Sequence, residues 1–304
     1  MKVSIIGAGA VGSTLAMRVV ENGLADVVLL DVLKDIAIGK SLDILDASPI
    51  VGHEKGIVGT GDYEYIRDSD IIVVTAGLPR KPGMTREELV SKNASIIRDV
   101  STKVKSHAPR AILIVVTNPL DAMTYLACMV TGFKKEKVFG MAGVLDGSRF
   151  IQLIASELKV RRSSVETYIL GSHGDTMVPL LSHTRVNGRP LEKVLSKERI
   201  ESIVNRTRDR GIEIVNLLGT GSAYYSPSAA VYKMIETIIN DTRETMTVSA
   251  CLAGEYGLND IAIGVPAVIG KNGIEKIVEL DLSGEEKTAF LESARAIKRS
   301  IDEL

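Results

Sequence analysis

The chain has 304 residues, 45% of them hydrophobic, which predicts two domains with cores large enough to need no disulfide or metal staple. Its 37 Lys and Arg residues balance 38 Asp and Glu residues, which argues against a general nucleic-acid binder and against a polybasic membrane-surface protein. Cys128 and Cys251 form no C-x-x-C motif, so a zinc site of paired cysteines is excluded and two buried thiols are expected.

No targeting or membrane segment is expected. The apolar N-terminal stretch is interrupted by glycines and followed by Arg18, unlike a secretory signal. No apolar run reaches the length of a membrane span. Together with the scarcity of cysteine, this predicts a cytoplasmic protein.

The first half alternates short apolar runs with helix-length segments. Strands are predicted at residues 3–6, 27–30, 71–75 and 112–117, with weaker candidates at 57–60 and 138–139. Helices are predicted at 11–21, 34–46, 85–105 and 120–130, the third opened by a Thr85/Glu88 capping box. Strands that alternate with helices in this way indicate a Rossmann-type, doubly wound parallel sheet over residues 1–142.

The rhythm changes after residue 142 and becomes α+β. A helix is predicted at 146–158, a strand at 165–170, a hairpin turn at Asn187-Gly188, and helices at 191–217 and 228–239. Strands at 245–252 and 261–268, a turn at Asn272-Gly273 and a last helix opened by a Ser283/Glu286 capping box follow. No linker separates the halves, so a second domain of residues 143–304 should pack directly on the first.

A phosphate-binding loop is predicted between the first strand and the first helix. Its sequence, a G-x-G-x-x-G, is Gly7, Ala8, Gly9, Ala10, Val11 and Gly12. The glycines permit a tight turn, backbone approach to a pyrophosphate and close helix–sheet packing, while the helix N-terminus offers free N–H groups. Asp31 ends the next strand, where a carboxylate can bind ribose hydroxyls and repel a 2′-phosphate. The predicted cofactor is therefore NAD rather than NADP.

One of the four histidines lies in a setting suited to chemistry. His53 is expected in a solvated turn, His107 at a helix end and His183 in a polar stretch. His173 follows an apolar run and stands in Gly171-Ser172-His173-Gly174-Asp175, where flanking glycines leave the imidazole open. It is the candidate general acid–base.

Three further segments accompany His173. Asp146 and Arg149 lie on one face of a helix start, which is also compatible with a local ion pair. The basic segment 76–86 resembles an active-site lid, although a solvated charged loop is the alternative. Asn118 follows a strand at the carboxyl edge of the sheet, where ligands bind in such folds.

These motifs, in this order, resemble the malate/lactate dehydrogenases, and most closely the malate dehydrogenases of the lactate-dehydrogenase-like group. They are G-A-G-A-V-G, Asp31, A-G-L-P-R-K-P-G-M-T-R, V-T-N-P, V-L-D-G-S-R and G-S-H-G-D-T-M-V-P. The resemblance covers the whole chain and implies reversible hydride transfer between (S)-malate and NAD⁺, no metal, and a homodimer or homotetramer.

The resemblance also implies roles for individual residues. His173 would move the proton and Asp146 would orient it, while Arg149 would bind the C1 carboxylate. Arg86 would polarise the reacting carbonyl, and Asn118 would bind the substrate oxygen. Cofactor contacts would come from Asn93, Val116, Thr117 and Asn118, with a cis bond between Asn118 and Pro119.

Arg80 separates the family's two substrates. Its guanidinium can pair with the second carboxylate of oxaloacetate, whereas the lactate dehydrogenases of the family have Gln at the corresponding position. L-Lactate dehydrogenase and a non-catalytic NAD-binding protein remain the alternatives. A short-chain dehydrogenase is excluded, because none of the eight tyrosines has Lys four residues later.

Overall fold

The computed structural model describes residues 1–78, 86–219 and 221–304, and the side chain of Arg86 is outside this description. The strands are β1 (Lys2–Ile6), β2 (Asp26–Leu30), β3 (Ile57–Thr60), β4 (Ile71–Val74), β5 (Ile112–Val115), β6 (Val138–Gly140), β7 (Val165–Glu166), β8 (Ile169–Gly171), β9 (Met177–Pro179), β10 (Arg185–Val186), β11 (Arg189–Pro190), β12 (Glu244–Ala253), β13 (Asn259–Gly270) and β14 (Gly273–Ile277).

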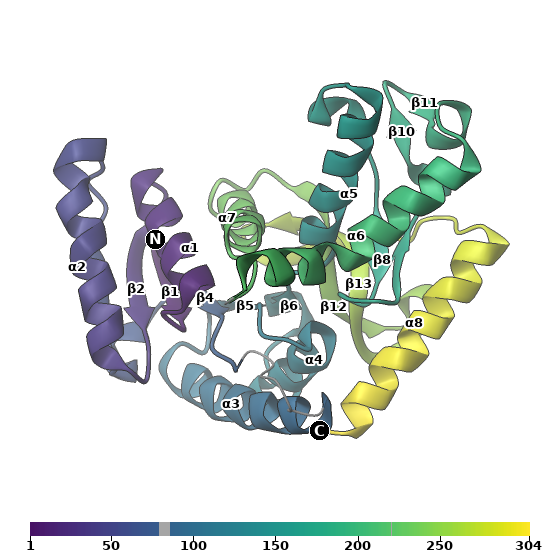
Figure 1. Cartoon of the computed structure of the whole chain (residues 1–304). Helices are drawn as coiled ribbons and strands as arrows, with labels where there is room; N and C mark the ends of the chain where they lie inside the picture. The colour runs from purple at the N-terminus through teal and green to yellow at the C-terminus, as the bar shows by residue number, and fades with distance from the viewer. Residues whose placement is uncertain (79–85, 220) are drawn as a thin grey trace.

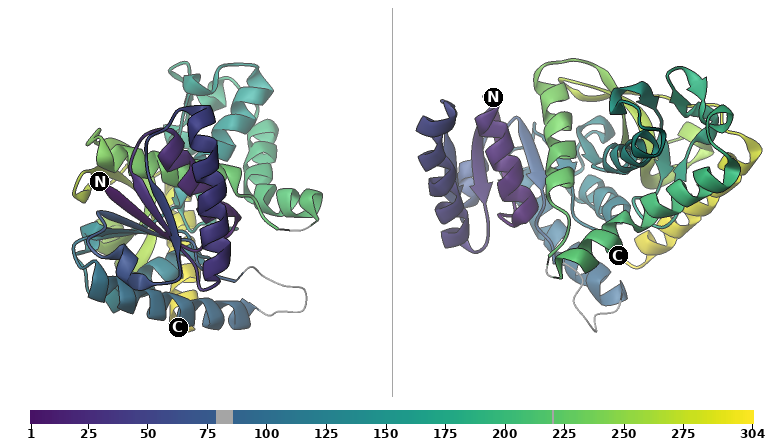
Figure 2. Two further views of the ribbon diagram at one scale, coloured as in Figure 1. Left: turned by 90° about the vertical axis from the view of Figure 1, so that its left-hand side faces the viewer. Right: turned by 45° about the horizontal axis from the view of Figure 1, so that its top comes forward.

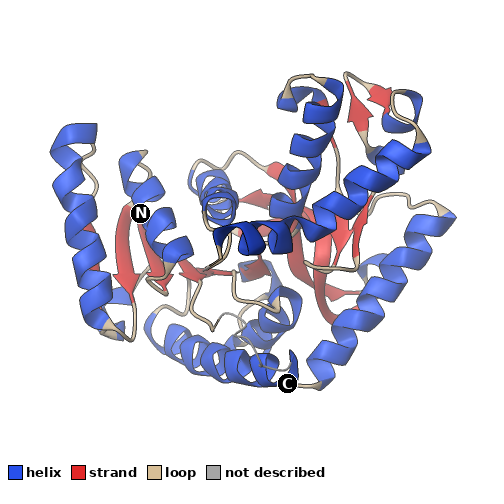
Figure 3. Cartoon of the chain, viewed as in Figure 1, coloured by secondary structure: helices blue, strands red, loops and turns tan. Residues whose placement is uncertain are grey.

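The α-helices cover the sheet on both faces (Figures 1 and 3). They are α1 (Ala10–Glu21), α2 (Lys34–Val51), α3 (Arg86–His107), α4 (Leu120–Thr131), α5 (Gly143–Leu158), α6 (Lys197–Leu218), α7 (Tyr225–Ile239) and α8 (Gly284–Asp302). Within the described residues, no helix is both long enough and apolar enough to cross a membrane.

The first six strands form the parallel part of one large sheet. Their order is β3-β2-β1-β4-β5-β6, and every neighbouring pair is parallel. Alternate residues of each strand enter different cores, because both faces of the sheet are covered. In β1, Val3 and Ile5 pack in a core with α1, whereas Ile6 packs in a core with α3. This two-sided burial explains why the strands read as continuous apolar runs.

The sheet continues from the first half of the chain into the second. Strand β6 pairs in parallel with β5 and antiparallel with β12, after which the order runs β12-β13-β8-β9, with β14 on β13. Helices α1 and α7 also lie side by side (Figure 2), where Arg18 Nε donates to Ser228 Oγ at 3.2 Å. The halves therefore share one sheet and a helix–helix contact, as the lack of a linker predicted.

Most predicted elements are confirmed, including the Rossmann-type parallel sheet, the α+β second half and the hairpin at Asn187-Gly188. The second capping box is formed by Ser283 and Glu286, whereas Thr85 of the first lies outside the described residues. Both cysteines are free and buried, as expected.

Several predicted boundaries are wrong. The strand expected at 165–170 is two short strands, β7 and β8, each paired with a different partner. The helix expected from residue 191 begins as a 3₁₀ turn, Leu191–Lys193, before α6 starts at Lys197. Strands β9 and β14 were not predicted.

The solvated turn expected around His53 is also wrong. Helix α2 continues past residue 46 to Val51, and Gly52 ends it with a φ of 79°. The chain then turns back toward β3, and the His53 side chain is buried with 6% exposure. Neither ring nitrogen has a hydrogen-bond partner among the residues that the structure describes.

Candidate active site

The loop between β1 and α1 has the geometry of a phosphate site. A Cβ on Gly12 would lie 1.9 Å from the Gly7 carbonyl oxygen, so this close approach of helix to loop requires glycine. A Cβ on Gly9, by contrast, would meet nothing within 4 Å, which leaves open space beside the backbone. Helix α1 begins at Ala10 with uncharged residues, so its first N–H groups and the positive end of its dipole are available to an anion.

The Asp31 carboxylate lies directly beside this loop. Its Oδ2 accepts a hydrogen bond from the Ala8 N–H at 2.6 Å, and its Oδ1 accepts one from the Leu33 N–H at 2.9 Å. Lys40 of α2 also contacts this loop, because its Nζ donates to the Ala8 carbonyl at 2.7 Å. Open glycine backbone, a helix N-terminus and an adjacent carboxylate fit the pyrophosphate and ribose of a dinucleotide.

Two further strand ends meet at the same edge of the sheet. The Thr117 hydroxyl, after β5, donates to the Ala76 carbonyl, after β4, at 2.7 Å. The Asn93 amide of α3 accepts from the Leu78 N–H at 2.8 Å and donates to the Asn118 carbonyl at 2.7 Å. Asn93 is 1% exposed, so its buried side chain ties Leu78, after β4, to Asn118, after β5. Its direct contact with NAD stays a prediction.

Asn118 itself presents an exposed side chain at this edge, and its bond to Pro119 is cis, as the resemblance implied. Val116 is half-buried and packs against a core that contains β1 and β5. Arg80 and the Arg86 side chain, the two arginines predicted in the lid, lie outside the described residues.

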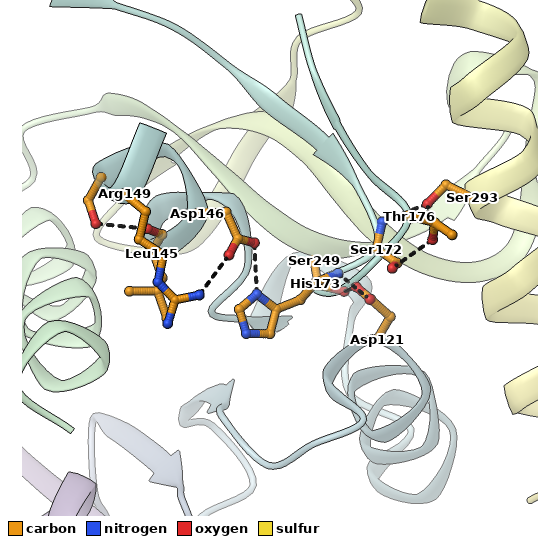
Figure 4. Close-up of polar contacts among 10 residues, drawn as sticks. Asp121, Leu145, Asp146, Arg149, Ser172, His173, Thr176, Ser249 and Ser293 are labelled. Atoms are coloured by element: carbon orange, nitrogen blue, oxygen red, sulfur yellow. Dashed lines mark hydrogen bonds and ion pairs between the residues drawn. The ribbon is translucent and has the colours of Figure 1, made fainter. Parts of the chain in front are cut away.

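Asp146 joins the two other predicted functional side chains (Figure 4). Its Oδ2 lies 2.8 Å from His173 Nδ1, and its Oδ1 lies 3.5 Å from an Arg149 terminal nitrogen. Helix α5 begins at Gly143, so Asp146 and Arg149 stand one turn apart on its first turns, as predicted. The contact with Asp146 occupies Nδ1 and leaves Nε2 of His173 for a ligand.

The surroundings of His173 favour its protonated form. Burial by itself lowers the pKa of the imidazole. The negative charge of Asp146, its hydrogen bond, and the charge of Asp121 oppose burial and raise the pKa above its ordinary 6.5. The positive charge of Arg149 lowers the pKa of the imidazole. The two carboxylates therefore stabilise the protonated imidazole.

Arg149 is a buried cation with spare donors. Its side chain is only 14% exposed, and its Nε has no hydrogen-bond partner among the residues that the structure describes. Burial lowers the pKa of the guanidinium, although Asp146 opposes this. A buried donor without a partner is costly unless a ligand completes it, and a carboxylate matches the guanidinium fork.

The loop that carries His173 is held by side chains that the sequence did not single out. Gly171 has a φ of 83°, and a Cβ there would lie 2.7 Å from Ser293 Oγ. The Ser172 N–H donates to Ser293 Oγ of α8 at 2.8 Å, and the His173 N–H donates to Asp121 Oδ2 of α4 at 2.9 Å. The one available signal was Asp121 itself, a charged residue among apolar neighbours in the first turn of α4.

A Rossmann sheet with a dinucleotide loop, next to a His–Asp pair and a buried arginine, defines an NAD-dependent dehydrogenase of 2-hydroxy acids. Residues 1–140 match the lactate/malate dehydrogenase NAD-binding domain, and residues 143–304 match the lactate/malate dehydrogenase alpha/beta C-terminal domain. The chain belongs to the lactate/malate dehydrogenase family, as its motifs indicated.

The chain is similar over its full length to proteins named malate dehydrogenase. It is 48% identical to that of Halalkalibacterium halodurans over 100% of this chain and 97% of the relative. It is 51% identical to that of a Roseiflexus species over 99% and 97%.

Solved structures agree. The malate dehydrogenase of Cryptosporidium parvum matches with a TM-score of 0.97 and 40% identity, over 100% of this chain and 98% of that one. The lactate dehydrogenase of the same organism, complexed with lactic acid and nicotinamide adenine dinucleotide, matches with a TM-score of 0.96 and 40% identity, over 99% and 96%.

Replacing Asp31 with Ala should weaken NADH binding by about 10- to 150-fold, the value of a hydrogen bond to a charged group. It should also reduce the preference for NADH over NADPH, because the charge that repels a 2′-phosphate is removed. Fluorescence titration with both nucleotides measures this. Asp35→Ala, an exposed carboxylate in the first turn of α2, is the matched control. A wild-type protein that uses NADPH as well as NADH would contradict this role.

Proposed function

We propose that the chain interconverts (S)-malate and oxaloacetate with NAD⁺ and NADH, with His173 as the general acid–base. One observation carries the proposal: Asp146 joins the imidazole of His173 to the guanidinium of Arg149, in a buried cluster whose free donors suit a 2-oxo or 2-hydroxy acid. The malate assignment is supported by relatives named malate dehydrogenase, which are 48–51% identical over almost the whole chain.

His173 transfers the proton to and from the substrate, and Asp146 assists it. During malate oxidation the neutral Nε2 accepts the hydroxyl proton, and Asp146 stabilises the imidazolium that forms on the other side of the ring. During oxaloacetate reduction the protonated Nε2 returns the proton to the substrate oxygen. The contact of Asp146 with Nδ1 sets the tautomer, so the proton enters and leaves at Nε2.

Arg149 and the strand ends orient the substrate. The guanidinium binds the C1 carboxylate. This carboxylate accepts hydrogen bonds from the donors of Arg149 that have no partner among the described residues. The Asn118 amide, exposed at the end of β5, hydrogen-bonds the substrate oxygen. When bound, NAD⁺ supplies the acceptor for the C2 hydride. Gly7–Gly12 and Asp31 would hold its pyrophosphate and ribose, and Asn93 and Val116–Asn118 would contact the rest of the cofactor.

Two further roles are proposed for Arg86 and Arg80, whose side chains lie outside the described residues. We assign Arg86 to the reacting carbonyl, where a positive charge stabilises the oxygen as it becomes negative. We assign Arg80 to the distal carboxylate of oxaloacetate. Lactate is the second candidate substrate, since the lactate dehydrogenase of C. parvum matches the fold almost as well as its malate dehydrogenase. The proposed role of Arg80 disfavours lactate, because a guanidinium left without a partner beside the methyl of pyruvate would be costly.

Replacing His173 with Ala should lower kcat by about 10²- to 10⁴-fold, since the general acid–base is lost. NADH binding should stay largely intact, because the predicted pyrophosphate contacts lie at Gly7–Gly12. Stopped-flow and steady-state assays of oxaloacetate reduction measure the first effect, and NADH fluorescence titration measures the second. His183→Ala is the control, because in the part of the chain that the structure describes its imidazole hydrogen-bonds the neighbouring Ser182. Normal turnover of His173→Ala would place the acid–base group elsewhere.

Replacing Arg80 with Gln should lower kcat/KM for oxaloacetate by about 10- to 150-fold, the value of a hydrogen bond to a charged group, and raise pyruvate reduction. Arg86→Gln is the matched comparison. It should lower turnover of both substrates, because the carbonyl is common to both. Assaying both variants on both substrates separates the two roles. An unchanged ratio of oxaloacetate to pyruvate activity in Arg80→Gln would remove the argument for malate at this residue.

We further propose that the chain forms a homodimer or homotetramer. Helix α2 supports this, because its inner residues Ala37 and Ile44 are buried while Leu42 and Ile50 are 56% and 86% exposed on its outer side. A helix with apolar side chains on both sides is typical of a buried one. The cytoplasmic location remains a prediction.

Replacing Leu42 with Glu should reduce the native mass measured by light scattering, since a charge would have to be desolvated in the interface. Glu292→Lys, an exposed charge change on α8, should leave the mass unchanged. The proposal fails if the wild-type protein itself has the 32.7 kDa mass of one chain.

A further inference from the structure

Asp121 is a buried carboxylate that none of the roles above uses. It lies in the first turn of α4 and is 5% exposed. Its Oδ2 accepts a hydrogen bond from the His173 N–H at 2.9 Å, and its Oδ1 accepts one from Ser249 Oγ at 2.7 Å. Ser249 is fully buried on β12, so Asp121 bridges α4, β12 and the His173 loop (Figure 4).

The protonation states of Asp121 and His173 depend on each other and on the charged groups nearby. The groups that act on it are His173, which favours the carboxylate, and Asp146 of α5, which disfavours it. Burial raises the pKa of Asp121 to about 6, although the hydrogen bonds from Ser249 and His173 lower it. Above that pH the side chain is an anion. The charges that act on His173 are those of Asp146 and Asp121, opposed by Arg149.

We propose that Asp121 is a positioning residue of the dehydrogenase reaction, which fixes the backbone of His173 from α4 and supplies a second buried negative charge that favours the protonated imidazole. Asp146 performs the matching task at the ring, through Nδ1. Oxaloacetate reduction needs a proton on His173. The negative charge of Asp121 therefore favours this direction of the reaction. This inference rests on the acid–base role proposed for His173.

The neighbouring peptide provides a natural comparison. The Ser172 N–H is held by Ser293 Oγ of α8, just as the His173 N–H is held by Asp121. Both side chains anchor the same loop, and both are buried. Ser293 is neutral, however, so its loss should loosen the loop without changing the charge near the imidazole. The two anchors therefore separate a positional effect from an electrostatic one.

The test compares Asp121→Asn with Ser293→Ala. The Asn amide oxygen can still accept from the His173 N–H, and its NH₂ can donate to Ser249 Oγ in a hydrogen bond of reversed direction, so both contacts can be kept while the charge is removed. The measurement is the pH profile of kcat/KM for oxaloacetate at saturating NADH. In Asp121→Asn the point at which activity falls with rising pH should move down by about 0.5 to 1 pH unit, because the imidazolium loses a nearby anion. On the high-pH side this equals a loss of about 3- to 10-fold.

Ser293→Ala should lower kcat without moving that point. A profile of Asp121→Asn that coincides with the wild type, or an equal shift in Ser293→Ala, overturns the proposal. NADH titration checks that each variant is folded. If Asp121→Asn does not fold, Ser249→Ala replaces it: Asp121 then loses a donor and protonates at a higher pH, so a smaller shift in the same direction is expected and an unmoved profile overturns the proposal. Failure of the proposed function is distinct, since it would appear as normal turnover of His173→Ala.

Discussion

The antiparallel pairing of β6 with β12 is the constraint on which the active site depends. At this seam Ser249 faces Gly140 and Ala250 faces Phe139. A Cβ on Gly140 would lie 2.4 Å from Thr124 Oγ1 of α4 and 3.1 Å from Ser249 Cβ, so α4 and β12 approach closely only because this residue is glycine. The seam brings the second half of the chain, with its His173 loop, against the strand ends that hold the nucleotide loop.

Three helices from distant parts of the chain then fix one short loop. Helix α4 holds the His173 N–H, α5 holds the ring, and α8 holds the Ser172 N–H. This arrangement keeps two carboxylates near one imidazole at a cost. A rise of the Asp121 pKa from 3.8 to about 6 means that ionising this group in the fold costs on the order of 3 kcal/mol. Stability linked to Asp121 is therefore full below pH 3.8 and lost as the pH rises toward 6.

The sequence was informative wherever a functional group belongs to a local pattern. The loop Gly7–Gly12 lies between a strand and a helix, and Asp146 and Arg149 are separated by one helical turn. Both features could therefore be predicted. Asp121, Ser249 and Ser293 could not, because they meet His173 through sheet and helix packing between segments far apart in the chain. Asn93 was predicted as a cofactor contact, but a pattern of residues does not show that its amide is engaged with Leu78 and Asn118. His53 was misplaced because α2 continues through Pro49, a residue that usually interrupts a helix, as far as Val51.

The fold and the hydrogen bonds around His173 do not determine which 2-hydroxy acid is the substrate. The malate and lactate dehydrogenases of C. parvum match the chain with TM-scores of 0.97 and 0.96, so the fold itself does not distinguish the two substrates. The groups proposed to act on C1 and C2, Arg149 and His173, would serve any 2-hydroxy acid. Oxaloacetate differs from pyruvate by one distal carboxylate, and a buried charge is tolerated only beside a partner of opposite sign. Selectivity therefore requires a cation at the far end of the substrate, and in this chain we assign that role to Arg80, which lies outside the described residues.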